Sequence, residues 1–173
     1  LRHYTGVKYD NSNGIAAVSN GIQTEAIYEA YKLLFNVGTP PTKDFMEKLL
    51  DGAQAEPDSM HTPRIAGIVT VGKPVLILGI KTNDSPAVAN IVTQAPGKMA
   101  GIATYKGNMD NPEATDPTAA LSELEFTGSS SQELTKYVYD ISAETCKGED
   151  IRVCAIGGIY SSNSWEIAII NKY

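Results

Sequence analysis

Near-continuous apolar runs rich in β-branched residues dominate the middle of the chain. Residues 65–71 and 75–80 are the clearest examples, with Gly72-Lys73-Pro74 between them. Apolar runs of this length without polar alternation are typical of strands that are covered on both faces. The pattern therefore predicts two neighbouring central strands. The weaker runs 87–93 and 99–105 predict further strands.

Two β-hairpins are predicted, one near each end of the chain. In each, two apolar runs flank a short segment of Asn, Asp, Ser and Gly, residues that favour chain reversal. The first hairpin comprises residues 3–9 and 15–19, and the second comprises residues 151–160 and 165–171 around the loop 161–164.

Helical periodicity is clearest in residues 24–36, where apolar side chains recur every three or four positions. We expect Thr24 to cap this helix and Gly38 to end it. Thr42 is expected to cap a second helix that Gly52 ends. The two segments predict a helical hairpin with a short, Pro-rich corner.

Two more helices are predicted in the second half of the chain. Asp116 stands directly before a proline, a pair that favours a helix start, and predicts a short helix over residues 117–126. Ser130 and Glu133 have the spacing of a capping box. A longer helix is therefore expected over residues 131–144.

Helices and strands come in clusters joined by local hairpins, not in strict β–α alternation. This order favours the α+β class, with one domain over residues 1–173 and a mostly antiparallel β-sheet with packed helices, two-layer or sandwich-like. We expect the sheet to contain residues 65–71, 75–80, 151–160 and 165–171, and the helices that begin near Thr24, Thr42 and Ser131 to cover it.

Charge and hydropathy disfavour several classes of function. The 173 residues carry a formal net charge of −6, which disfavours nucleic-acid binding because that needs clustered Lys and Arg. The longest apolar runs, such as residues 75–78, are too short to span a bilayer. A composition rich in Asn, Ser, Thr and Gly favours an extracellular protein. The chain begins with Leu1, which we interpret as a processed or trimmed start.

Cys146 and Cys154 are the only two cysteines of the chain. The first follows the predicted helix and the second lies on the next predicted strand, so the reversal between them can bring the two Cα atoms within bonding range. We expect a disulfide between them, with two buried thiols as the alternative. Their spacing fits neither a zinc motif nor a close-spaced redox pair.

Few side chains are suited to acid–base chemistry. His61, one of two histidines, lies in a polar loop with Asp58 and Ser59, and we interpret it as solvated and dispensable for chemistry because residues adjacent in sequence seldom form a triad. Glu166 follows Trp165 on an apolar strand. Contact with the ring would raise the pKa of the carboxyl by desolvation, although an outward-facing carboxylate is the simpler interpretation.

The loop between residues 107 and 116 offers four side chains with oxygen atoms. Calcium ions take six to eight such ligands, and the spacing does not match the twelve-residue calcium loop. We therefore predict a polar surface loop and no bound metal. The four residues are Asn108, Asp110, Glu113 and Asp116.

Gly128, Ser129, Ser130 and Ser131 lead directly into a predicted helix. Exposed backbone N–H groups at a helix start can hold an anion, so this segment is a candidate anion-binding site, although capping alone explains the serines. Asn83 stands in an Asn-X-Ser glycosylation pattern that the proline directly after it weakens.

These patterns favour a non-catalytic, secreted or extracellular binding or interaction protein of the toxin or effector kind. Its expected partner is a protein or surface ligand of unknown identity, with no nucleic acid, no membrane span and no cofactor. The support is the lack of a catalytic motif, the scarcity of His and the expected disulfide. The alternative is a small hydrolase with a site assembled around His61 or Glu166.

Overall fold

The structure is a computed structural model, and it describes residues 5–53, 61–71, 75–93, 95–119 and 121–172. Asp58 and Ser59, the neighbours of His61 in the polar loop, lie outside these residues.

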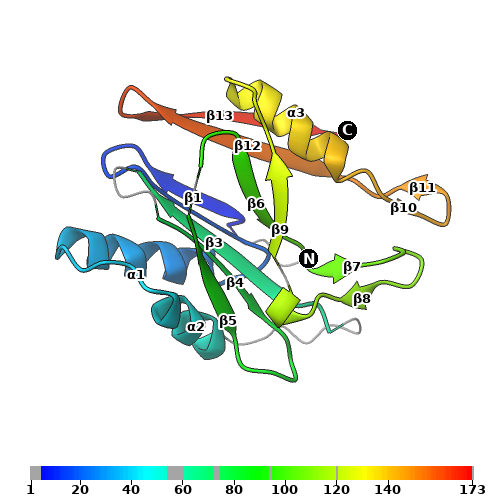
Figure 1. The fold of residues 1–173 in the computed structure, drawn as a ribbon, viewed down its shortest axis with the longest axis horizontal. Helices are drawn as coiled ribbons and strands as arrows, with labels where there is room; N and C mark the ends of the chain where they lie inside the picture. Colours follow the sequence, from blue (N-terminus) through cyan, green and yellow to red (C-terminus); the bar gives the residue numbers. More distant parts are fainter. Residues whose placement is uncertain (1–4, 54–60, 72–74, 94, 120, 173) are drawn as a thin grey trace.

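Five strands of the first half of the chain form one antiparallel sheet (Figure 1). Each strand pairs with the one before it in sequence, which places β3 and β4 inside the sheet and confirms the interpretation of the two long apolar runs. The strands are β1 (Val7–Asp10), β2 (Ile15–Ser19), β3 (Arg64–Thr70), β4 (Val75–Lys81) and β5 (Val88–Val92).

Helices α1 (Thr24–Asn36) and α2 (Lys43–Gly52) cover one face of this sheet. Their apolar side chains pack on the strand residues that point the same way, and the core formed there includes the fully buried Tyr31, Ile68 and Ile77. Thr42 caps α2 as predicted, because its hydroxyl accepts from the N–H of Phe45 at 3.3 Å. Thr24 does not cap α1: Gln23 is the N-cap residue and makes no side-chain cap hydrogen bond.

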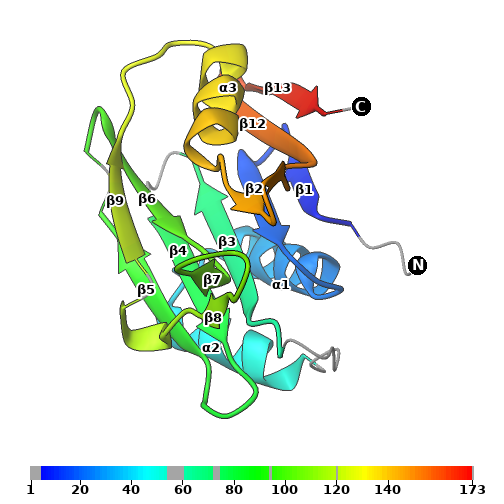
Figure 2. The same ribbon diagram turned by 90° about the vertical axis from the view of Figure 1, so that its right-hand side faces the viewer.

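The opposite face of the sheet is covered by two separate two-stranded sheets, β6–β9 and β12–β13 (Figure 2). Helix α3 (Ser131–Ile141) packs on β12 and β13 and is capped by the predicted capping box of Ser130 and Glu133. The strands are β6 (Lys98–Ile102), β9 (Leu121–Glu125), β12 (Cys154–Ser161) and β13 (Ser164–Asn171), and two shorter hairpins are β7 (Tyr105–Lys106) with β8 (Glu113–Ala114) and β10 (Thr145–Cys146) with β11 (Glu149–Asp150).

The α+β class with mostly antiparallel sheets is confirmed, but two details of the prediction are wrong. Strands β12 and β13 are not hydrogen-bonded to β3 and β4, so they do not belong to the same sheet. The predicted helix over residues 117–126 is a single 3₁₀ turn, Pro117–Ala119, followed by strand β9. The Asp-Pro pair starts a turn as expected, but pairing with β6 then determines the conformation of β9.

No helix among the residues that the structure describes is long and apolar enough to cross a membrane.

Asp10 holds the turn between β1 and β2 and ties it to α1. Its carboxylate accepts from the N–H groups of Ser12 and Asn13 at 2.7 and 3.2 Å and from the hydroxyl of Tyr28 at 3.2 Å. The ammonium group of Lys32 lies 3.0 Å away. The hydroxyl of Ser12 and the charge of Lys32 hold the pKa of Asp10 well below its usual range, against the opposing effect of burial.

We expect Asp10→Asn to lower the free energy of unfolding at pH 7 by about 1.5–3 kcal/mol, the usual size of hydrogen bonds to a charged group. The folded-state pKa is lowered, so the stabilisation is present above the usual Asp pKa of about 3.9 and is lost as the pH falls through the folded value. Urea unfolding at pH 7 and at pH 2 checks this. The difference between the native protein and the variant is expected to shrink at pH 2, and an equal difference at both pH values would contradict it.

Gly157 of β12 lies directly beneath α3. A Cβ atom at this position would lie 2.5 Å from Oγ1 of Thr135 and 3.1 Å from its backbone nitrogen. Thr135 is fully buried, and its hydroxyl bonds to the carbonyl oxygens of Ser131 at 2.6 Å and Ala168 at 3.3 Å. The helix therefore rests on the glycine through a side chain that has little freedom to move.

Gly157→Ala is expected to destabilise the fold by about 1–3 kcal/mol through overpacking at this contact. The matched control is Gly101→Ala on β6, where the added Cβ would meet the side chain of Leu124 at an ordinary 3.7 Å. Thermal unfolding of both variants measures the difference. Equal melting temperatures would mean that α3 moves aside without loss.

Candidate functional site

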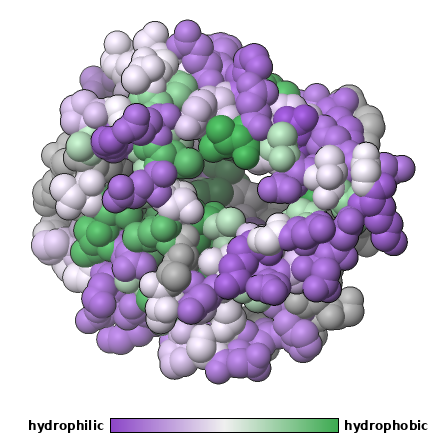
Figure 3. All heavy atoms as spheres, turned by 45° about the vertical axis from the view of Figure 1, so that its right-hand side comes forward, coloured by the Kyte–Doolittle hydropathy of each residue, from purple (hydrophilic) through white to green (hydrophobic). Residues whose placement is uncertain are grey.

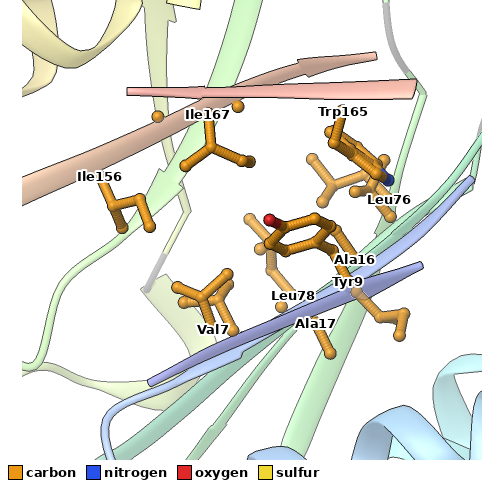
Figure 4. A pocket seen from close by; sticks show the side chains of 15 residues that line it. Val7, Tyr9, Ala16, Ala17, Leu76, Leu78, Ile156, Trp165 and Ile167 are labelled. Carbon is orange, nitrogen blue, oxygen red and sulfur yellow. The ribbon is translucent and has the colours of Figure 1, made fainter. Parts of the chain in front are cut away.

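A cavity of about 230 Å³ lies between the main sheet and the hairpin β12–β13. Its wall is almost entirely apolar, with Val7 and Ile167 facing each other from β1 and β13 (Figure 4). Two aromatic side chains, Tyr9 and Trp165, belong to this wall, and Tyr9 brings its hydroxyl to it. Nε1 of Trp165 is buried and has no hydrogen-bond partner among the described residues.

Strand alternation places these side chains. Ala17 and Ile68 point toward α1 and α2 and are almost fully buried there. Val18 and Gly67, their neighbours in sequence, are paired in the register and point to the opposite side, toward the cavity. The cavity and the helix-covered core therefore lie on opposite faces of the same strands.

The hollow between the layers continues beyond this cavity. A second cavity of about 860 Å³ lies between the main sheet and β6–β9, and Val69 and Leu76 line both cavities. Figure 3 shows a hollow on this side of the molecule with hydrophobic residues in and around it. The face of the sheet that points away from α1 and α2 is thus only partly packed.

The strand ends next to the first cavity are polar. Asn20 lies two residues after Val18, and Ile65 lies two residues before Gly67, the residue that pairs with Val18. Two residues span about 6.6 Å along a strand. The side chain of Asn20 closes this end, because its Oδ1 accepts from the N–H of Ile65 at 2.9 Å and its Nδ2 donates to the carbonyl of Pro63 at 2.8 Å.

Further polar groups gather at the same strand ends. The hydroxyls of Thr62 and Tyr105 form a hydrogen bond between the start of β3 and β7. Nδ2 of Asn83 lies 2.9 Å from Nδ1 of His61. Because the amide N–H donates a hydrogen bond to Nδ1, the neutral imidazole carries its own proton on Nε2. The φ of His61 is 50°, an uncommon value for a residue other than glycine. We call the set Asn20, His61, Thr62, Arg64, Asn83 and Tyr105 the polar end.

Several polar groups at or near this end are buried. Arg64 is 9% exposed, and its Nη1 donates to the carbonyl of Asn20 at 3.4 Å. Nε2 of Gln23 and Oγ1 of Thr115 are buried without a hydrogen-bond partner among the described residues. Unpartnered buried polar atoms are rare in native folds, and these two lie on segments that adjoin the polar end.

The sequence pattern did not single out Arg64, Thr62 or Tyr105. Arg64 had a usable signal, because it is an ionisable residue placed directly before the most apolar run of the chain. A charge at the edge of a buried strand is seldom fully buried without a partner or a role. The contact of Thr62 with Tyr105 had no such signal, since 43 residues separate the two.

The predicted disulfide is absent, and both cysteines are free in the structure. Cys146 belongs to the small hairpin β10–β11, where it pairs with Glu149. Cys154 is exposed and begins β12, where it pairs with Asn171. The chain after α3 forms its own hairpin before β12 begins, so the simple reversal that motivated the disulfide does not occur.

The candidate anion site at the start of α3 has its described donors already in use. The N–H groups of Ser129 and Ser130 donate to Oε2 of Glu133 at 2.8 and 3.1 Å. These bonds hold the pKa of Glu133 below its usual value, so the carboxylate is charged and serves as the anion. Ser131 donates to Glu166 at 2.6 Å, which places this exposed carboxylate on the α3 side of β13.

The loop with four oxygen-bearing residues is organised by local turns. Asn108 accepts from the N–H of Asp110 at 2.8 Å, and Asp116 accepts from the N–H of Thr118 at 2.8 Å. Across the described ranges, no group of three or more His, Cys, Asp and Glu residues could hold a metal ion. Glycosylation of Asn83 stays a prediction, and its side chain is the partner of His61.

Comparisons with known proteins point to one family. The family model described as IMP cyclohydrolase-like protein matches residues 3–164. An IMP cyclohydrolase of Methanocella arvoryzae is 29% identical over 157 residues, which cover 91% of this chain. The same match covers 66% of that relative, so the chain spans just under two thirds of its length.

These findings overturn the expected function. The relative is an enzyme, so the interpretation as a non-catalytic, secreted binding protein of the toxin or effector kind is wrong, as is the extracellular location that went with it. The composition that suggested secretion was a weak signal, and the expected disulfide that supported it is absent. The match over residues 3–164 shows that the chain belongs to the family of IMP cyclohydrolase-like proteins.

Proposed function

We propose that this chain catalyses the gain or loss of water at the six-membered ring of inosine 5′-monophosphate (IMP), in the cavity between the main sheet and β12–β13. The observation that carries the reaction class is the family match over residues 3–164. The activity is a proposal for this chain because the chain spans 66% of the relative that bears the name.

The reaction sets clear demands on a site. In the ring-closing direction, a carboxamide nitrogen attacks a formyl carbon, a C–N bond forms, and the formyl oxygen leaves as water after taking up two protons. The opening direction reverses these steps. The site must hold a planar ring, bring the two reacting groups together and supply a group that exchanges protons.

The cavity meets the first demand. Its wall is apolar, and the rings of Tyr9 and Trp165 face it from opposite layers. Flat heterocycles bind well against aromatic and aliphatic walls. The buried N–H of Trp165 has no partner among the described residues, and a ring nitrogen or carbonyl oxygen of a bound base offers an acceptor. We further propose that the β layers act together as a sandwich of one domain whose interior forms this binding site.

The polar end supplies the chemistry. The hydroxyl of Tyr105 is held by Thr62, two residues before the start of β3. A held hydroxyl can donate a proton to one partner while it accepts one from another, which is what the departing water requires. We assign the proton exchange to Tyr105 and its orientation to Thr62.

Incubation of the full chain with IMP is expected to give the ring-opened formamido nucleotide, and incubation with that nucleotide is expected to give IMP. Both reactions change the mass by one water and are followed by liquid chromatography with mass detection. A folded chain that converts neither compound above the rate of a protein-free control would falsify the proposed reaction.

Tyr105→Phe is expected to lower kcat by roughly 10²–10³-fold with little change in KM, because one proton-exchange group is lost while the binding surface stays. Tyr137→Phe is the matched control. Tyr137 lies on α3 against Phe126, with 5.3 Å between the ring centroids, and its hydroxyl makes no described contact at the polar end. Similar kcat values for the two variants would remove Tyr105 from the mechanism.

A further inference from the structure

We propose that the turn Asn20-Gly21 between β2 and α1 is an anion-binding site and that it takes the phosphate monoester of a nucleotide. The identity of the anion rests on the proposed function. The binding of an anion rests on the hydrogen-bond donors that meet at this turn.

The first donors belong to the start of α1. This helix has 13 residues, and its N-cap residue Gln23 makes no side-chain cap hydrogen bond. The first N–H groups of a helix have no partner within the helix, and the helix dipole favours negative charge beside them. Glu25 brings a carboxylate into this turn, but the ammonium group of Lys8 pairs with it.

Gln23 provides a second and independent observation. Its side chain is only 4% exposed, and Nε2 has no hydrogen-bond partner among the described residues. The amide folds back over Gly21, where an added Cβ would lie 2.4 Å from Oε1 and 3.2 Å from Nε2 of Gln23. A buried amide donor without an acceptor is satisfied when a ligand with an acceptor oxygen binds there.

Arg64 brings a positive charge to the same turn. Its guanidinium donates to the carbonyl of Asn20 at 3.4 Å, so it lies beside the residue that precedes Gly21. It is 9% exposed, and burial strengthens its attraction to an anion. The planar guanidinium is well suited to phosphate because its N–H groups match the spacing of two phosphate oxygens.

The acceptors of the turn are occupied. The carbonyl of Gly21 accepts from the hydroxyls of Ser19 at 3.1 Å and Thr24 at 3.3 Å, and the carbonyl of Asn20 accepts from Arg64. Nε2 of Gln23 is therefore a donor without a described partner beside matched acceptors, which selects a ligand with acceptor oxygens. A phosphate monoester is such a ligand, and a neutral sugar or base edge is a poorer match.

The position of the turn agrees with the proposed substrate. Asn20 follows Val18 of the cavity wall by two residues, about 6.6 Å along a strand. A ribose separates the phosphate of a nucleotide from its base by a comparable length. A phosphate held at the turn therefore leaves the base able to reach the near end of the cavity wall at Val18.

The test uses the full chain and calorimetric titration with inorganic phosphate, IMP and inosine. We expect the native chain to bind IMP more tightly than inosine. We expect Gln23→Leu to weaken phosphate and IMP binding about tenfold and to leave inosine binding unchanged, since one hydrogen bond to a charged group is lost. The melting temperature of Gln23→Leu is expected to stay equal or to rise, because a buried donor without a partner is removed.

Two further variants sharpen the test. Gly21→Ala displaces the Gln23 amide and is expected to weaken IMP binding as Gln23→Leu does. Gln132→Leu, on the exposed first turn of α3, is the matched control and is expected to change neither binding nor stability. Unchanged phosphate and IMP affinity in Gln23→Leu, or an equal loss for inosine, would overturn the site.

The two proposals fail separately. Phosphate binding that depends on Gln23 without any conversion of IMP would keep the anion site and refute the proposed reaction. Conversion of IMP with an unchanged KM in Gln23→Leu would keep the reaction and refute the site.

Discussion

The antiparallel register of β2, β3 and β4 determines both the core and the site. Ile68 and Ile77 pair across β3 and β4 and point into the core under α1 and α2, while their neighbours Gly67 and Leu78 pair with each other and face the cavity. A slip of one residue would exchange the two sets and move every core side chain into the hollow. The position of the polar end depends on the same pairing, because Asn20 and Ile65 continue the register beyond the last paired residues of β2.

The two faces of the sheet are packed to different degrees. Protein interiors are normally filled almost as densely as organic crystals, and an apolar cavity forfeits the contacts that its wall would otherwise make. The helix-covered face follows this rule, whereas the other face keeps cavities of about 230 and 860 Å³. Under the proposed function, a bound planar ring would fill part of this space and contact Tyr9 and Trp165.

The sequence predicted the elements that local signals determine. The helix over residues 24–36 was predicted at both ends, and Thr42 and Ser130 cap their helices. Strand β9 was missed because its conformation comes from pairing with β6, about 20 residues earlier in the chain, and neither partner has a strong pattern of its own. The placement of β12 and β13 in a sheet of their own was missed for a related reason: a run such as residues 154–161 shows that a strand exists, not which strand lies beside it.

The site was less predictable than the fold because its contacts are long-range. Thr62 meets Tyr105 across 43 residues, and Arg64 meets Asn20 across 44. None of these residues forms a catalytic motif in sequence, and a functional site can be assembled in space without one. The lack of a motif was therefore no argument for a non-catalytic protein, and neither was the scarcity of histidine.

Gln23 illustrates how a folded chain can retain a group that does not help it fold. A buried donor without a partner costs about 1–3 kcal/mol, and a leucine of similar size would avoid that cost. The amide fits because residue 21 is glycine and leaves the space beside it open. Local consistency between sequence and structure is the rule in natural folds, and the positions that break it are concentrated where ligands bind. The indole N–H of Trp165 is a second buried donor without a partner among the described residues, and the same reasoning makes it a position where function and not folding explains the residue.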